Sequence, residues 1–80
     1  MSYFPNPVKD ELYLEWETID DNTVISINVY GMNGQLLKTY FGNRKVNFQN
    51  IAFHSYPSGV YAAVLLFNNG EQNAIKIIKQ

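Results

Sequence analysis

Apolar and polar residues alternate along most of this chain with a period of two, the pattern of β-strands that bury one face. The first such segment, Glu11–Glu17, places Leu12, Leu14 and Trp16 on one face. Comparable segments follow at short intervals, at residues 24–30, 35–40, 44–49, 51–53, 60–67 and 74–78. No long segment shows the 3.6-residue period of an amphipathic helix, so the pattern predicts an all-β protein.

Turn-forming residues separate these segments. Asn33-Gly34 is the favoured central pair of a type I′ hairpin turn, so Gly31-Met32-Asn33-Gly34 is expected to close a hairpin. Pro57-Ser58-Gly59 indicates a turn that opens directly into the next strand, and Gly59 is expected to have φ > 0 or to lie in close backbone contact. Short strands joined in this way predict a small antiparallel Ig-like β-sandwich of about seven strands. The 80 residues suffice for a single domain, residues 1–80.

The alternation also predicts which side chains form the core. We expect seven large residues to be buried, namely Leu12, Leu14, Ile27, Val29, Tyr61, Leu65 and Ile77. By the same alternation, Ile25 shares a face with Ile27 and Val29, and Val46 and Phe48 point inward.

The segment 60–67 differs from the others because it is apolar on both faces. If Tyr61 and Leu65 face the core, then Ala62, Val64 and Leu66 face outward. A row of outward-facing apolar side chains on so small a domain is expected to be covered, either by another segment of the same chain or by another molecule. We therefore predict self-association through a surface that includes Val64 or Leu66.

Composition excludes several classes of function. The chain has no cysteine and one histidine, which leaves no disulfide framework and no set of ligands for a structural zinc. The net charge is −1 and no basic stripe is present, so nucleic acid is not an expected partner. No apolar run is long enough for a membrane helix, and the N-terminus lacks the pattern of a signal peptide. No cofactor is predicted.

Three polar groups are candidates for sites of chemistry. Glu15 and Glu17 lie on one strand face and resemble an acid–base pair, but a small sandwich has no deep cleft to separate their pKa values. Asp20-Asp21-Asn22 offers oxygen atoms to Ca²⁺ but also fits a turn held by its own side chains. His54 and Ser55, with Asp20 or Asp21, are the residue types of a catalytic triad, but nothing in the sequence indicates the geometry that a triad requires. We predict no catalytic and no metal site.

Aromatic residues make up 15% of the chain and allow a binding function. Tyr13, Trp16, Tyr30 and Tyr40 could together form a stacking platform for sugars, although core packing and cross-strand pairing also account for them. The alternative function is accordingly an Ig-like accessory module that binds a glycan or a protein and stays on the mature product.

Charges are distributed unevenly. Six of the seven acidic residues precede residue 22, and five of the six basic residues follow it. Lys76 and Lys79 are the only charged side chains among the last nine residues. Neighbouring strands of opposite charge explain this division, and so does a basic C-terminal tip that is exposed to a receptor.

Four short motifs, in a fixed order, resemble the C-terminal sorting domain of the bacterial type IX secretion system. They are Pro5-Asn6-Pro7, Tyr30 with Gly34-Gln35, Pro57-Ser58-Gly59 with Tyr61, and the terminal Lys76 with Lys79. The resemblance spans nearly the whole chain and implies a β-sandwich. It departs from the family at segment 60–67, whose outward positions are usually polar there.

The resemblance implies a role in export and no catalysis. A family member of this kind is carried by a cargo protein of Bacteroidetes that crosses the inner membrane through its own signal peptide. The domain is then recognised at the outer-membrane translocon, between periplasm and cell surface, and a sortase-like cysteine protease removes it. The freed cargo is often attached to lipopolysaccharide. On this interpretation, Met1-Ser2 precede a domain taken from a longer precursor.

Overall fold

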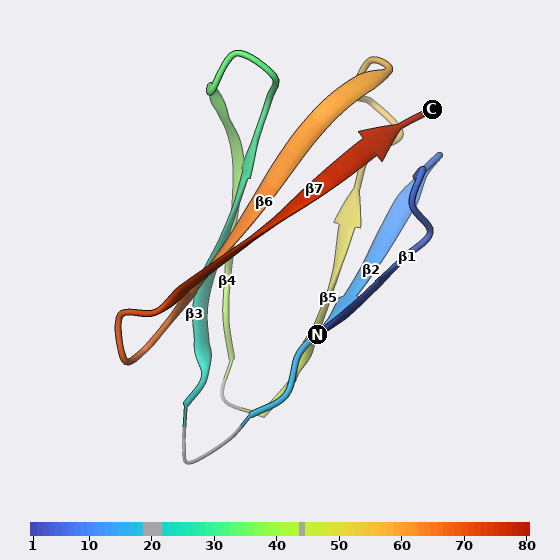
Figure 1. Ribbon diagram of the computed structural model, residues 1–80. Helices are drawn as coiled ribbons and strands as arrows, with labels where there is room; N and C mark the ends of the chain where they lie inside the picture. The colour runs from blue at the N-terminus through green and yellow to red at the C-terminus, as the bar shows by residue number, and fades with distance from the viewer. Residues whose placement is uncertain (19–21, 44) are drawn as a thin grey trace.

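The computed structural model describes residues 1–18, 22–43 and 45–80, which form seven strands and no helix (Figure 1). The strands are β1 (Ser2–Phe4), β2 (Glu11–Glu15), β3 (Val24–Tyr30), β4 (Leu36–Phe41), β5 (Phe48–Ala52), β6 (Gly59–Phe67) and β7 (Gln72–Lys79). The all-β prediction is confirmed.

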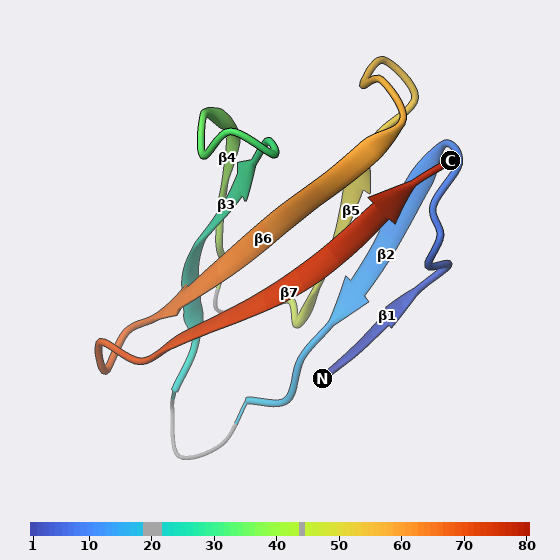
Figure 2. The same ribbon diagram turned by 45° about the horizontal axis from the view of Figure 1, so that its top comes forward.

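The strands form two antiparallel sheets that face each other as a sandwich (Figures 1 and 2). The smaller sheet has the order β1-β2-β5 and the larger one has the order β4-β3-β6-β7. In constant-type immunoglobulin domains the fourth strand joins the sheet of strands one, two and five. Here β4 instead forms a hairpin with β3, so the larger sheet gains a strand.

The core lies between the two sheets and consists mainly of buried side chains from β2, β3 and β6, with one residue each from β5 and β7. All seven predicted core residues are buried, and the most exposed of them, Tyr61, keeps 6% of its surface. Val8, Trp16, Val24, Ile51, Phe53, Ala63 and Phe67 complete the buried set. Each large side chain of this kind stabilises the fold by roughly 1.5–3 kcal/mol.

The prediction for Ile25 is wrong, because β3 contains an irregularity. The pairing of β3 with β6 shifts between Val24 and Ser26, so that Val24 and Ile27 both face the core. Ile25 therefore points outward and is 45% exposed. Its carbonyl oxygen accepts a hydrogen bond from Gly42 N–H at 3.0 Å, where β4 ends.

The predictions for Val46 and Phe48 are also wrong. The segments 44–49 and 51–53 were expected as two strands, but β5 covers Phe48–Ala52 as one. Ile51 pairs with Leu12 and is buried, which leaves Phe48 opposite Glu15 on the outer face, 41% exposed. One buried position thus sets the orientation of the whole strand, since side chains alternate between faces.

The hairpin after β3 has a different turn from the predicted type I′. Gly34 N–H donates to Gly31 O at 3.0 Å, so Met32 and Asn33 are the central pair, and Gly34 follows with φ +81°. This is the three-residue loop with a bulge at glycine. The turn at Phe67–Glu71 repeats it, with Gly70 at φ +90°. In both turns an Asn side-chain oxygen accepts a hydrogen bond from the backbone N–H two residues later. Asn33 accepts from Gln35, and Asn69 accepts from Glu71.

Candidate functional site

The four motifs lie far apart in the sequence but meet at one end of the sandwich, which we call the motif end (Figures 1 and 2). Strand pairing brings them there. Lys79 of β7 lies opposite Gly59 of β6, and on its other side Val8 forms a parallel bridge to it. Tyr30, which precedes the β3–β4 turn, lies opposite Ala62 of β6.

The first motif docks onto the last strand. The Asn6 side chain accepts a hydrogen bond from Ile78 N–H at 3.0 Å and donates one to Lys76 O at 3.3 Å. Val8 continues the contact, since its N–H donates to Ile78 O at 2.7 Å and its carbonyl accepts from Gln80 N–H at 2.8 Å. β1 belongs to the smaller sheet and β7 to the larger, so this segment joins both sheets.

The Pro57-Ser58-Gly59 turn is held by aromatic side chains from both sides of it. The Tyr61 hydroxyl donates a hydrogen bond to Pro57 O at 2.5 Å. The Tyr56 and Tyr61 rings are stacked with centroids 5.5 Å apart, and the Phe53 ring makes a T-shaped contact with each of them. Because Phe53 and Tyr61 are buried, the turn is anchored to the core.

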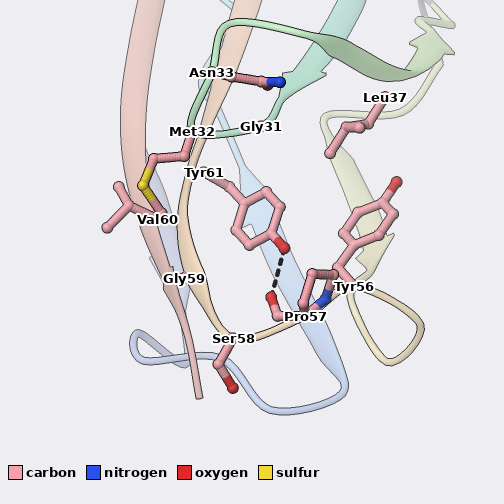
Figure 3. Close-up of a pocket in the computed structure, with 10 residues that line it drawn as sticks. All are labelled: Gly31, Met32, Asn33, Leu37, Tyr56, Pro57, Ser58, Gly59, Val60 and Tyr61. Atoms are coloured by element: carbon pink, nitrogen blue, oxygen red, sulfur yellow. Dashed lines mark hydrogen bonds between the residues drawn. The ribbon is translucent and has the colours of Figure 1, made fainter.

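A cavity of about 290 Å³ lies between this turn and the β3–β4 turn (Figure 3). Its walls are mostly apolar and come from the β3–β4 turn, from Leu37 and from the segment 56–61, which contains the third motif. Figure 3 shows the Tyr61 ring in the middle, with the Tyr56 ring and Leu37 on one side and Met32 and Val60 on the other. The Ser58 hydroxyl points away from the cavity. An apolar side chain of a partner would fit such a space better than a charged group.

Gly59 has the backbone conformation that was predicted for it, with φ +156°. Residues that carry a side chain rarely adopt this backbone conformation. A Cβ atom at this position would lie 3.4 Å from the Met32 methyl group, which is the end of a flexible side chain. Glycine is therefore required here by backbone conformation and not by lack of space.

Tyr56 carries an uncharged hydroxyl at the wall of the cavity. Burial raises its pKa above the ordinary value of 10.0, and the neighbouring Tyr40 and Tyr61 raise the pKa further. The group therefore acts as a neutral hydrogen-bonding group at physiological pH.

The exposed surface of the larger sheet is apolar over much of its area, and we call it the outer face. It carries Val60, Ala62, Val64 and Leu66 of β6, with Ala74 and Ile78 opposite them on β7. Val64 and Leu66 are partly buried by their neighbours, whereas Phe41 of β4, which pairs with Ser26, is 81% exposed. Neither figure shows a described strand over this face.

The two lysines of the last motif differ in their surroundings. Lys76 is exposed on the outer face, where it lines a hollow of about 350 Å³ together with Met32, Val60, Ala62 and Ala74. Lys79 is partly buried, and its Nζ donates to Gln80 O at 3.1 Å. Lys76 is thus the better placed of the two for a carboxylate of a partner.

The remaining predicted recognition residues lie near the cavity but outside its lining. Gly34 and Gln35 form the exposed tip of the β3–β4 turn, and the Tyr30 hydroxyl accepts a 3.5 Å hydrogen bond from Asn28 Nδ2. The cavity instead uses Gly31, Met32 and Asn33 of the same turn.

The sugar platform proposed from the sequence does not form. Trp16 is buried in the core, while Tyr13 and Tyr30 lie on the outer surfaces of opposite sheets. A different row of rings is present on the smaller sheet, where Tyr13 contacts Phe4 and Phe48 with centroids 5.3 and 5.8 Å away. The Tyr13 hydroxyl donates to Glu15 Oε1 at 2.6 Å, and this bond raises the pKa of Tyr13.

The other candidate sites remain surface features. Glu15, Glu17 and His54 are exposed, and Asp20 and Asp21 lie outside the described residues. Within the described ranges, no three His, Cys, Asp or Glu side chains are grouped so as to hold a metal ion. In the same ranges no helix has the length and apolar character needed to cross a membrane.

Sequence reasoning missed Met32, Leu37 and Tyr56 as cavity residues. Met32 and Tyr56 lie in turns, where alternation gives no direction, and Leu37 is a strand residue of β4 that faces the cavity only because the β5–β6 turn lies beside it. It also missed the contact between Asn6 and β7. An Asn between two prolines signals a turn but does not indicate which strand its side chain reaches.

Comparison with known proteins identifies the family. The chain matches the secretion system C-terminal sorting domain over residues 2–80. No curated protein and no solved structure matches it significantly. The match covers all four motifs and the whole sandwich, and we conclude that the chain belongs to this family of type IX secretion sorting domains.

Proposed function

We propose that this domain is the address of a secreted cargo protein and that the export machinery reads it at the motif end. The convergence of four motifs at that end is the observation that supports the proposal most strongly. Residues from four separate segments of the chain gather at one end of the sandwich there, as a recognition site requires.

The receptor that recognises this sorting signal is a component of the outer-membrane translocon. Two features supply contacts of different kinds, namely the apolar cavity beside Tyr61 and the exposed Lys76 over the hollow of the outer face. An apolar side chain of the receptor enters the cavity, and a carboxylate pairs with the Lys76 ammonium group. The domain passes through the periplasm with its cargo, and a sortase-like cysteine protease removes it at the cell surface.

A reporter fusion tests this proposal. The domain is joined to a reporter with a signal peptide and expressed in a bacterium that has type IX secretion. We expect the unmodified fusion to reach the surface or the medium. The Lys76→Ala plus Lys79→Ala variant should fold but leave more reporter in the periplasm.

The matched control is Lys38→Ala plus Lys45→Ala, which removes the same charge at two positions outside the four motifs. Normal delivery of the first variant would place the address elsewhere. Equal retention of both variants would mean that net charge matters and position does not.

The aromatic row of Phe4, Tyr13 and Phe48 favours one second candidate, a module that binds a glycan or a protein and stays on the mature product. The two functions differ in the fate of the domain. Mass spectrometry of the exported protein separates them, because an address is missing from the mature product and a binding module is retained.

A further inference from the structure

β7 is one of the two edge strands of the larger sheet, and the N-terminal segment covers part of its outer edge. In an antiparallel pair, alternate residues turn their N–H and C=O groups toward the partner strand and away from it. Asn6 and Val8 contact Lys76 O, Ile78 and Gln80 N–H, so the even-numbered residues of β7 face this edge.

The segment Asn6–Val8, which we call the cover, protects only the C-terminal half of the β7 edge. From Lys76 O to Gln80 the edge groups are paired with Asn6 and Val8, while no strand within residues 1–18, 22–43 and 45–80 pairs with Gln72 and Ala74 on this side. Half of the edge is therefore closed by two residues, and half is open. The open half adjoins Lys76, which carries the charge of the proposed address.

We propose that the edge of β7 is the docking edge for an extended strand of the export receptor, and that Asn6–Val8 is an internal substitute that must leave first. The substitute defines the direction of the incoming strand. Val8 runs parallel to β7 at Lys79, so a strand that replaces it also runs parallel. Main-chain hydrogen bonds of this kind supply affinity in strand addition. This inference rests on the proposed function, since it specifies how the address is read.

The Asn6 side chain is the part of the cover most open to change. It supplies two of the four hydrogen bonds and is exposed, whereas Val8 is buried in the core. Replacing Asn6 by Ala removes both side-chain bonds without opening a cavity. Asn50→Ala is the matched control, because Asn50 is an exposed Asn on β5 in the other sheet.

Hydrogen exchange measured by NMR tests the cover directly. In Asn6→Ala we expect the amides of Ile78 and Gln80 to exchange at least tenfold faster than in the wild type. The amides of Ile27 and Leu65, in the middle of the sheet, should keep their rates, and Asn50→Ala should change none of the four. Unchanged exchange at Ile78, or an equal increase at all four amides, would overturn the idea of a local cover.

A disulfide lock tests the need for release. The chain has no cysteine of its own, so Val8→Cys with Lys79→Cys creates a single defined pair at adjacent strand positions, within the reach of a disulfide. We expect export of the locked fusion to fall at least tenfold below that of Val8→Ala with Lys79→Cys, which loses the same lysine and similar packing but cannot be locked.

The outcomes separate the two proposals. If the wild-type fusion is exported and the locked and unlocked variants leave the cell equally well, the edge is not the docking site. If the wild-type fusion itself stays in the periplasm, the sorting function fails and the docking claim fails with it, while the exchange rates still decide whether Asn6 protects the edge.

Discussion

Gly59 is the position at which the backbone most directly requires glycine. Its φ of +156° follows from the sharp entry of the chain into β6 after Pro57, where Tyr61 already holds the turn through Pro57 O. The sequence predicted this conformation because glycine after Pro-Ser indicates a turn. It could not predict the Met32 methyl group beside Gly59, since that contact arises from the separate β3–β4 hairpin.

We predict that Gly59→Ala lowers the free energy of unfolding by about 1–3 kcal/mol, the cost of holding a side chain in a glycine conformation. Urea denaturation measures it. Gly31→Ala is the matched control, because its Cβ would meet nothing closer than 3.5 Å. The control should leave stability nearly unchanged, and a Gly59 variant as stable as the control would refute the backbone explanation.

A second residue-scale prediction concerns the core. Ile77→Ala should lower the free energy of unfolding by about 2–5 kcal/mol, because it leaves a cavity among fully buried neighbours. A domain of this size has only a few kcal/mol in reserve. Ile78→Ala, on the outward side of the same strand, should cost far less. Equal losses measured by thermal unfolding would mean that β7 does not alternate as described.

At the scale of the element, alternation predicted strand positions well and strand ends poorly. β3 was predicted with its observed bounds, and β6 within one residue. β1 was missed because three residues are too few for a periodic signal, and β5 was divided because Asn50 reads as a turn residue. The shift within β3 could not be predicted, since Ile25 is as apolar as its neighbours and only the bulge turns it outward.

The close approach of β3 and β4 gives an element-scale prediction. A Cβ atom on Gly42 would lie 1.8 Å from Val24 O, a backbone atom that cannot move away cheaply. Gly42→Ala should therefore cost about 3 kcal/mol of stability, as overpacking does. Chemical denaturation checks the size of the effect against Gly31→Ala. Stability equal to the wild type would show that β4 can leave β3 at this point without loss.

At the scale of the whole molecule, the sandwich and its core followed from pattern alone, whereas the motif end did not. Period-two alternation states which face is buried but not which strands become neighbours. The pairing of Val8 with Lys79 joins residues near opposite ends of the chain, and no local signal encodes it. The outer face was anticipated in part, because Ala62, Val64 and Leu66 had to point outward once Tyr61 and Leu65 pointed in.

We predict that the outer face mediates self-association. Sedimentation at high micromolar concentration should detect dimers that Val64→Lys or Leu66→Lys weakens, since a charge on an apolar contact surface is costly to bury. Asn50→Lys adds the same charge on the smaller sheet and should leave association unchanged. A strict monomer at these concentrations would contradict the prediction.

The meeting of the first and last motifs has a consequence for protein synthesis. The surface they share is assembled only after β7 has been synthesised and has folded against Asn6, because β7 follows the other six strands in the chain. A polypeptide whose translation stops before β7 has no such surface, however well its earlier parts fold. A sorting signal built in this way is absent from any polypeptide that stops before β7, so such a truncated cargo is left behind without a separate inspection step.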